Sequence, residues 1–150
     1  MIVSRNPYNG EEVASIKEFT KKDIDEALDV ADKRFQSWKQ TSFSERSKLM
    51  MAAAVELKKN KKEYAETITL EMGKPISQAI SEVEKCAWVC EYYAENAEKH
   101  LAKEIIKTDA RKSYTSFEPI GIVLAVMPWN YPFWQVFRFA APALMAGNIG

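Results

Sequence analysis

The feature that most constrains the fold of this chain is a long apolar stretch near its C-terminus, divided by one sharp turn. Residues Gly121 to Met127 include two valines and an isoleucine and carry no charge. This composition favours a strand covered on both faces, as in a parallel sheet flanked by helices. From Phe133 to Met145 only Gln135 and Arg138 are strongly polar, so a helix here would be buried nearly all round. The order strand, turn, helix predicts an α/β fold.

The turn is the best candidate for a ligand site. In an open α/β sheet, ligands bind where the chain leaves the carboxyl end of a strand, and here that loop is Pro128-Trp129-Asn130. Its one strong polar group is the amide of Asn130. The side-chain oxygen could cap the following helix, or the NH₂ group could stabilise an oxyanion on a reacting carbonyl. The residues alone leave both interpretations open.

Composition argues against several classes of partner. The 21 basic and 21 acidic residues balance, so no net field attracts nucleic acid or an anionic membrane. The apolar stretch is interrupted by Pro128, Pro132 and Pro142 and contains amide and charged side chains, which argues against a membrane span. The N-terminus has no apolar signal-peptide core, and we expect the protein in the cytoplasm.

Turn formers and helical periodicity predict a small hairpin and then four helices. The hairpin joins Ile2–Arg5 to Glu12–Ile16. Thr20 caps the first helix, and Ser42 with Glu45 forms a capping box that opens the second. The residues expected to face inward include Ile24, Leu28, Phe35 and Trp38 in the first helix, and Leu49, Ala53 and Leu57 in the second.

The third and fourth helices are separated by a glycine and a proline. The third runs from about Lys61 to Met72 and stops at Gly73, and Pro75 opens the longest helix. Its expected inward positions are Ile76, Ala79, Ile80, Val83, Ala87, Cys90, Ala94, Ala97 and Leu101. After it, Lys112 to Glu118 alternates between polar and aromatic residues and predicts an exposed antiparallel strand.

Cys86 and Cys90 are the only thiols and could be ligands or nucleophiles. They lie four residues apart on one helix face among apolar neighbours, which favours buried, inert thiols. A zinc site would need further ligands, and the single histidine, His100, lies too far along the helix to complete one. We therefore expect no metal site.

Two motifs in the apolar stretch resemble those of the aldehyde dehydrogenase superfamily. In that family a strand ending in Pro-Trp-Asn precedes a helix that closes with Pro-Ala-Leu-x-x-Gly-Asn, and here these are Pro128 to Asn130 and Pro142 to Asn148. The likeness continues upstream through Thr69 to Pro75 and Asn6-Pro7, and so covers essentially the whole chain. In detail, MPWNYPFWQVFR and EMGKPISQA look most similar to the succinate-semialdehyde dehydrogenase branch.

The resemblance implies a fold and a division of the chain. Residues 1–110 would form the N-terminal hairpin and a four-helix layer, and residues 111–119 one strand of a projecting oligomerisation arm. Residues 120–150 would begin an NAD(P)-binding, Rossmann-like domain with its first strand and helix. The resemblance also implies a homo-oligomer.

The resemblance implies a role for each residue around the turn. Asn130 would hold the oxyanion formed when a cysteine thiolate attacks an aldehyde, and the nicotinamide end of NAD or NADP would lie near the backbone of Met127, Pro128 and Trp129. Arg138 would grip the carboxylate of succinate semialdehyde, with Tyr131 and Trp134 also lining the substrate site. A structural alternative for Arg138 is a cation–π contact with Trp134, one turn earlier.

The chain also departs from the family pattern. The attacking cysteine, the glutamate base and the residues that select NAD or NADP would all lie beyond Gly150. We therefore expect an N-terminal fragment of a dehydrogenase that oxidises succinate semialdehyde to succinate when complete, and that is inactive alone. The alternative is a non-catalytic helical module that self-associates through its apolar segment.

Overall fold

A computed structural model describes residues 1–150, which form both helices and short strands, as the α/β prediction requires. The strands make two antiparallel pairs, β1 with β2 and β3 with β4. The elements in chain order are β1 (Ile2–Arg5), β2 (Glu12–Ile16), α1 (Lys21–Trp38), α2 (Phe43–Lys59), α3 (Lys61–Met72), α4 (Ile76–His100), β3 (Glu104–Ile105), β4 (Tyr114–Thr115) and α5 (Pro132–Met145). No helix is both long enough and apolar enough to cross a membrane.

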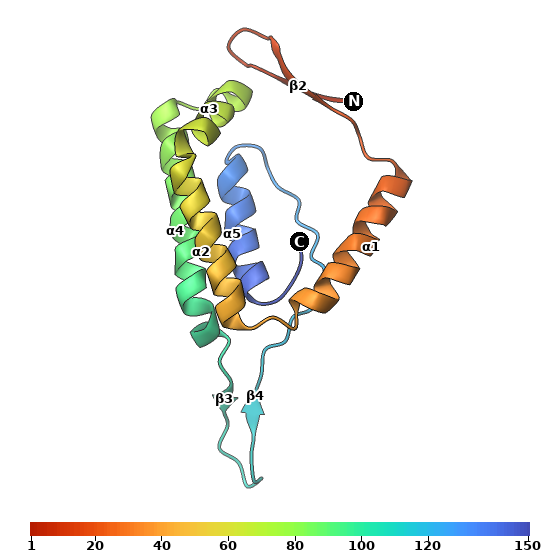
Figure 1. Ribbon diagram of the computed structural model, residues 1–150, viewed down its shortest axis with the longest axis vertical. Coiled ribbons are helices and arrows are strands. Elements are labelled where there is room, and N and C mark those ends of the chain that lie inside the picture. The colour runs from red at the N-terminus through yellow and green to blue at the C-terminus, as the bar shows by residue number, and fades with distance from the viewer.

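The helix α4 is the centre of the helical layer. It packs against α2, α3 and α5, and Figure 1 shows α2, α4 and α5 side by side, with the β3–β4 hairpin projecting beyond one end of the layer. More than half of the 15 buried hydrophobic residues of the core lie on α4. They include five of the predicted inward positions that carry small side chains, which let neighbouring helices approach closely: Ala79, Ala87, Cys90, Ala94 and Ala97.

Local signals set the helix boundaries, as the sequence predicts. Capping boxes open α1 and α2, where the hydroxyls of Thr20 and Ser42 each accept a hydrogen bond from a backbone N–H three residues later. The helix α3 ends at Gly73, whose φ of +73° lies in the left-handed region that glycine enters without steric cost. The hairpin strands β1 and β2 also have their predicted bounds.

The predicted burial of α1 and of α5 is wrong for residues 1–150. Ile24 and Leu28 are exposed on α1, which lies apart from the layer in Figure 1, although Trp38 at its end donates from Nε1 to the carbonyl of Leu144 at 3.0 Å. On α5 only Ala141 and Met145 are buried. Helical periodicity shows which side chains share a face, but not whether the fold provides a surface to cover that face.

The buried face of α2 is rotated from the predicted one. Leu57 is buried as predicted, but Leu49 is 58% exposed, and its neighbour Met50 is buried instead, together with Ala54. Arg46 completes this stripe, and its guanidinium lies over the ring of Phe43, 4.7 Å from the centroid. A buried arginine was not expected from the sequence, and the buried stripe passes through Met50 and Ala54, one residue after the predicted Leu49 and Ala53.

The strand predicted at Lys112 to Glu118 is shorter than expected but antiparallel, as predicted. Only Tyr114–Thr115 is regular, and it pairs with Glu104–Ile105 to form the projecting hairpin. Ile105 is exposed on this hairpin. The two strands therefore leave hydrogen-bonding edges and an apolar side chain available to another chain.

The segment from Gly121 to Met127 is extended but is not a regular strand. Its one ladder contact is a parallel bridge between Ile122 and Ile149, which begins a strand–helix–strand crossover around α5. Leu124 and Val126 are 89% and 84% exposed, so the predicted burial on both faces is not found here. A parallel strand is buried only where other strands flank both of its edges and helices cover both of its faces. Residues 1–150 do not provide this complete set of neighbours.

The end of α5 is tied to the start of this extended segment. Gly147 has the predicted C-terminal position and a φ of +86°, and a Cβ there would lie 3.0 Å from Nη1 of Arg46. Asn148 Oδ1 accepts hydrogen bonds from the amides of Ile120 (2.7 Å) and Gly121 (3.2 Å). The Gly-Asn pair thus ends the helix and fixes the chain that leads to the candidate loop.

Candidate functional site

An open cleft of about 800 Å³ lies between α4 and the start of α5. One wall comes from α4 and the other from the loop and first turns of α5. Four of the residues predicted for the substrate site line it together, namely Asn130, Tyr131, Trp134 and Arg138. The other lining residues are Ser77, Gln78, Ser81, Glu82, Lys85 and Gln135.

The residues predicted to contact the cofactor do not line this cleft. Met127, Pro128 and Trp129 precede it on the loop, where Trp129 is exposed. No backbone group from residue 124 to residue 130 takes part in a backbone hydrogen bond. Apart from Pro128, which has no N–H, each residue of this stretch therefore keeps a backbone donor and a backbone acceptor without a partner in the backbone.

The capping interpretation of Asn130 is wrong. The N-cap of α5 is Tyr131, and no side chain of the loop caps the helix. Asn130 is exposed at the edge of the cleft, and its amide makes no hydrogen bond within the chain. Its NH₂ group is therefore free to donate to a ligand in the cleft.

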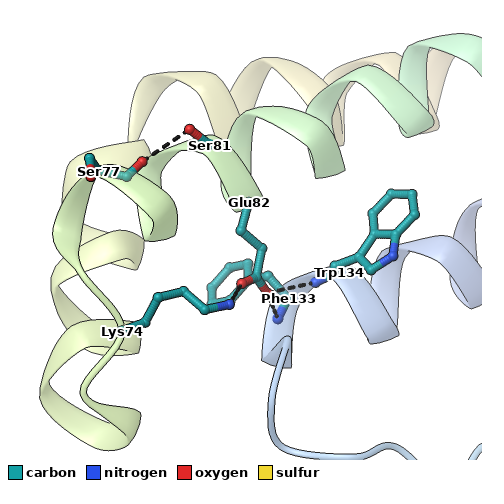
Figure 2. Close-up of polar contacts among 6 residues, drawn as sticks. All are labelled: Lys74, Ser77, Ser81, Glu82, Phe133 and Trp134. Atoms are coloured by element: carbon teal, nitrogen blue, oxygen red, sulfur yellow. Dashed lines mark hydrogen bonds and ion pairs between the residues drawn. The ribbon is translucent and has the colours of Figure 1, made fainter.

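Glu82, on the neighbouring helix, caps α5 in place of Asn130. Figure 2 shows its carboxylate reaching from α4 to the first turn of α5, where Oε1 accepts hydrogen bonds from the amides of Phe133 and Trp134, both at 3.0 Å. Its other oxygen, Oε2, pairs with the ammonium of Lys74 from the link between α3 and α4. Both side chains of this ion pair are buried. The carboxylate thus serves two of the amides that a helix start leaves without partners.

The sequence contains a signal for the structural role of Glu82, which the predictions above do not include. Glu82 lies three residues after Ala79 and four before Cys86, within the face of α4 that was predicted to be buried. A carboxylate on such a face must find a cation or several N–H donors, since burying it unpaired is costly. Lys74 belongs to the motif from Thr69 to Pro75, and nothing in the sequence shows that it is buried.

Arg138 is exposed in the cleft and does not make the alternative contact with Trp134. Lys85 on α4 is placed over the Trp134 ring instead, with Nζ 4.0 Å from the centroid. Neither Arg138 nor Lys85 has a carboxylate oxygen within 4.0 Å. The cleft therefore carries two cations that no acid neutralises, while its one carboxylate, Glu82, is already paired with Lys74.

The two thiols are buried on α4, as predicted. Burial, together with the negative charge of Glu82, raises the pKa of Cys86 to about 12, and burial with Glu91 raises the pKa of Cys90 to about 11. A thiol with so high a pKa holds its proton at neutral pH and is a poor nucleophile. Neither cysteine lines the cleft, and no group of three or more His, Cys, Asp or Glu side chains is placed to hold a metal ion.

We expect Cys86 and Cys90 to resist alkylation in the folded protein. At pH 8 their thiolate fractions should be lower than in the unfolded chain by about 10²-fold or more, because the pKa of an unperturbed thiol is about 8.5. Iodoacetamide labelling, followed by mass spectrometry of the two peptides with and without urea, measures this difference. Equal labelling rates in the two states would show that α4 does not protect these thiols.

Comparison with known proteins assigns the family. The model of the aldehyde dehydrogenase family matches residues 1–149. The chain belongs to the aldehyde dehydrogenase family. The resemblance found in the sequence is thus confirmed over the whole chain.

Relatives of this aldehyde dehydrogenase chain include proteins named as succinate-semialdehyde dehydrogenases. A probable NADP(+) enzyme of this name from Synechocystis is 49% identical over 99% of the chain, and succinate-semialdehyde dehydrogenase [NADP(+)] 1 of Mycobacterium bovis is 45% identical over 99%. The chain covers 33% of each, so it spans a third of the length of these curated relatives and matches their N-terminal part. The similarity to the succinate-semialdehyde dehydrogenase branch is therefore confirmed.

Solved structures agree with this assignment. Succinic semialdehyde dehydrogenase from Streptococcus pyogenes, in complex with NADP+, superposes with a TM-score of 0.92 at 31% identity, over 97% of the chain and 32% of that protein. Betaine aldehyde dehydrogenase from Staphylococcus aureus, in complex with NAD+, gives a TM-score of 0.91 at 32% identity, over 98% of the chain and 30% of that protein. Family members thus bind either nicotinamide cofactor on this fold.

Proposed function

We propose that this chain supplies the aldehyde-binding side of an active site that oxidises succinate semialdehyde to succinate with NAD or NADP. The observation that carries the proposal is that Asn130 and Arg138 line one cleft, the first with a free amide donor and the second with a free guanidinium. A short substrate with an aldehyde at one end and a carboxylate at the other matches this pair of groups.

The proposed role of Asn130 is to donate its NH₂ group to the aldehyde oxygen. As a nucleophile adds to the carbonyl carbon, negative charge develops on that oxygen, and a fixed donor stabilises the charge without reorganisation. The nucleophile would come from outside residues 1–150, because both cysteines here are buried with raised pKa values. Residues 1–150 alone are therefore expected to oxidise no aldehyde.

The charge of the cleft supports an acidic substrate. Arg138 and Lys85 approach it from opposite walls without acidic partners, and Glu82 is neutralised by Lys74. A guanidinium can hold a carboxylate through two parallel hydrogen bonds, which gives both attraction and orientation. Lys85, held over the Trp134 ring, adds a second positive charge to the same cleft.

The cofactor is proposed to lie along the free backbone of Met127, Pro128 and Trp129. When bound, its nicotinamide ring supplies the hydride acceptor. The unpaired backbone groups of the loop would bind and orient the ring beside the cleft that Asn130 borders.

We expect Arg138→Leu, in a complete enzyme that contains this segment, to raise KM for succinate semialdehyde at least about tenfold, or about 1.4 kcal/mol. The loss should be specific for the carboxylate, so an uncharged aldehyde of similar length should be oxidised with nearly unchanged kinetics. Steady-state kinetics on both aldehydes measure the difference. Leucine keeps an apolar side chain on the helix and removes the charge.

A matched control for this experiment is Arg34→Leu, which removes an exposed arginine from α1, away from the cleft. We expect no change on either aldehyde. Equal losses on the charged and uncharged aldehydes in Arg138→Leu would reject the proposed substrate, because the guanidinium would then not recognise the carboxylate.

The proposed oligomer is a homo-oligomer formed in part through the β3–β4 hairpin. Its free strand edges and the exposed Ile105 support this. The proposed location is the cytoplasm, which suits two unpaired thiols. The alternative is a non-catalytic self-associating module. The exposed Leu124 and Val126 support it, but it does not explain the polar cleft.

A further inference from the structure

The ion pair between Lys74 and Glu82 connects three segments that border the cleft. Lys74 comes from the link before α4, Glu82 comes from α4, and the amides of Phe133 and Trp134 belong to the first turn of α5. Figure 2 shows these groups converging on a single carboxylate. Because Glu82 has both oxygens engaged and is 4% exposed, it has little freedom to move.

Lys74 also contacts the loop that carries Asn130. Its Nζ lies 3.7 Å from the ring centroid of Tyr131, which directly follows Asn130 in the chain. Asn130 itself makes no hydrogen bond, so its position depends on what holds its neighbours. On the C-terminal side of Asn130, the chain is positioned by the contact of Tyr131 with Lys74 and by the hydrogen bonds of two α5 amides to Glu82.

The element that supplies the capping side chain of α5 determines how the two walls of the cleft are held relative to each other. A capping side chain within the loop would stabilise α5 without relating it to any other element. Here the cap is supplied by α4, which forms the opposite wall through Ser77, Ser81 and Lys85. One carboxylate therefore fixes the start of α5 relative to the wall that it faces.

We propose that the buried Lys74–Glu82 pair is a positioning device that holds Asn130 at the aldehyde oxygen, by anchoring the first turn of α5 to α4. This inference rests on the proposed function of Asn130. Glu82 and Lys74 act through the loop and touch no reacting atom. Oxyanion stabilisation requires a donor at a set distance from the developing charge, so a small displacement of the loop lowers the rate strongly.

The test compares two neutral versions of the pair in a complete enzyme. Lys74→Met with Glu82→Gln keeps an oxygen that can accept from the two amides, whereas Lys74→Met with Glu82→Met removes it at similar volume. Neither version leaves a buried unpaired charge, so both are expected to fold. We expect kcat to be about 10- to 100-fold lower in the version without the acceptor, with KM for the aldehyde changing less.

The same comparison is then made in the Asn130→Ala background. If Glu82 acts through Asn130, the two versions should differ there by less than about twofold, because the group to be positioned is gone. A full 10- to 100-fold loss that persists without Asn130 would overturn the inference, as would equal kcat values in the original comparison. Glu84→Gln, which removes an exposed carboxylate of α4 that pairs with Lys61, is the control and should leave kcat unchanged.

A second measurement separates this inference from the proposed function. Amide hydrogen exchange at Phe133 and Trp134 should be faster in the version without the acceptor, whatever Asn130 does. If Asn130→Ala alone leaves kcat intact, the proposed function of Asn130 fails, and the positioning of Asn130 for catalysis fails with it. If Asn130→Ala lowers kcat while exchange at the two amides is the same in both versions, only the positioning inference fails.

Discussion

Asn130→Ala is expected to lower kcat of a complete enzyme by about 10²- to 10³-fold, the usual loss for one oxyanion donor. The change in KM should be smaller, because the donor acts mainly on charge that develops after the aldehyde is bound. The free energy of unfolding should hardly change, since Asn130 is exposed and makes no hydrogen bond within the chain. Steady-state kinetics and urea unfolding measure the two effects separately.

A variant of the same shape distinguishes donation from packing. Asn130→Asp keeps the size of the side chain but replaces the NH₂ donor with a charged oxygen, which repels an oxyanion. We expect its kcat to be at least as low as that of Asn130→Ala. Normal turnover with lowered stability in either variant would contradict the catalytic role and return Asn130 to a structural one.

Lys74→Met is expected to destabilise the fold by about 3–5 kcal/mol, because it leaves the Glu82 carboxylate buried without its cation. The side chains of the pair are only 6% and 2% exposed, so water cannot compensate for the lost charge. The measurement is urea unfolding of a complete enzyme, monitored by tryptophan fluorescence. Adding Glu82→Gln should recover most of the loss, since no buried charge then remains.

The control is another lysine–glutamate pair that involves α4. Lys61 and Glu84 lie 2.5 Å apart, but their side chains are 39% and 49% exposed. Lys61→Met should cost no more than about 1 kcal/mol, because exposed ion pairs are screened by water and salt. A similar cost for the two lysine variants would show that the environment of Lys74 is not the cause.

Local patterns predicted the elements well. The starts of α1 and α2 follow from capping residues, and the end of α3 and the start of α4 follow from Gly73 and Pro75. The bounds of β1 and β2 follow from the turn formers between them, and all of these signals act within a few residues of themselves. The buried faces of the helices were predicted less well, as the exposure of Ile24 on α1 and Leu49 on α2 shows. Periodicity orders side chains around a helix axis, whereas burial depends on distant segments that supply the opposing surface.

Some features of the candidate site also follow from the sequence, whereas others depend on the tertiary structure. The sequence by itself determined the family, the loop that ends in Asn130 and the helix that carries Trp134 and Arg138, because these depend on motifs and on spacing along one helix. Only the tertiary structure decided that Glu82 caps α5, that Lys74 is buried beside it, and that Lys85 covers the Trp134 ring. The contacts of Glu82 and Lys85 with α5 join α4 to residues about 50 positions later in the chain, such as Glu82 to Phe133 at a separation of 51. Hydrogen bonds and ion pairs act over a few ångströms in space, and neither composition nor periodicity records which distant residues the fold brings within that range.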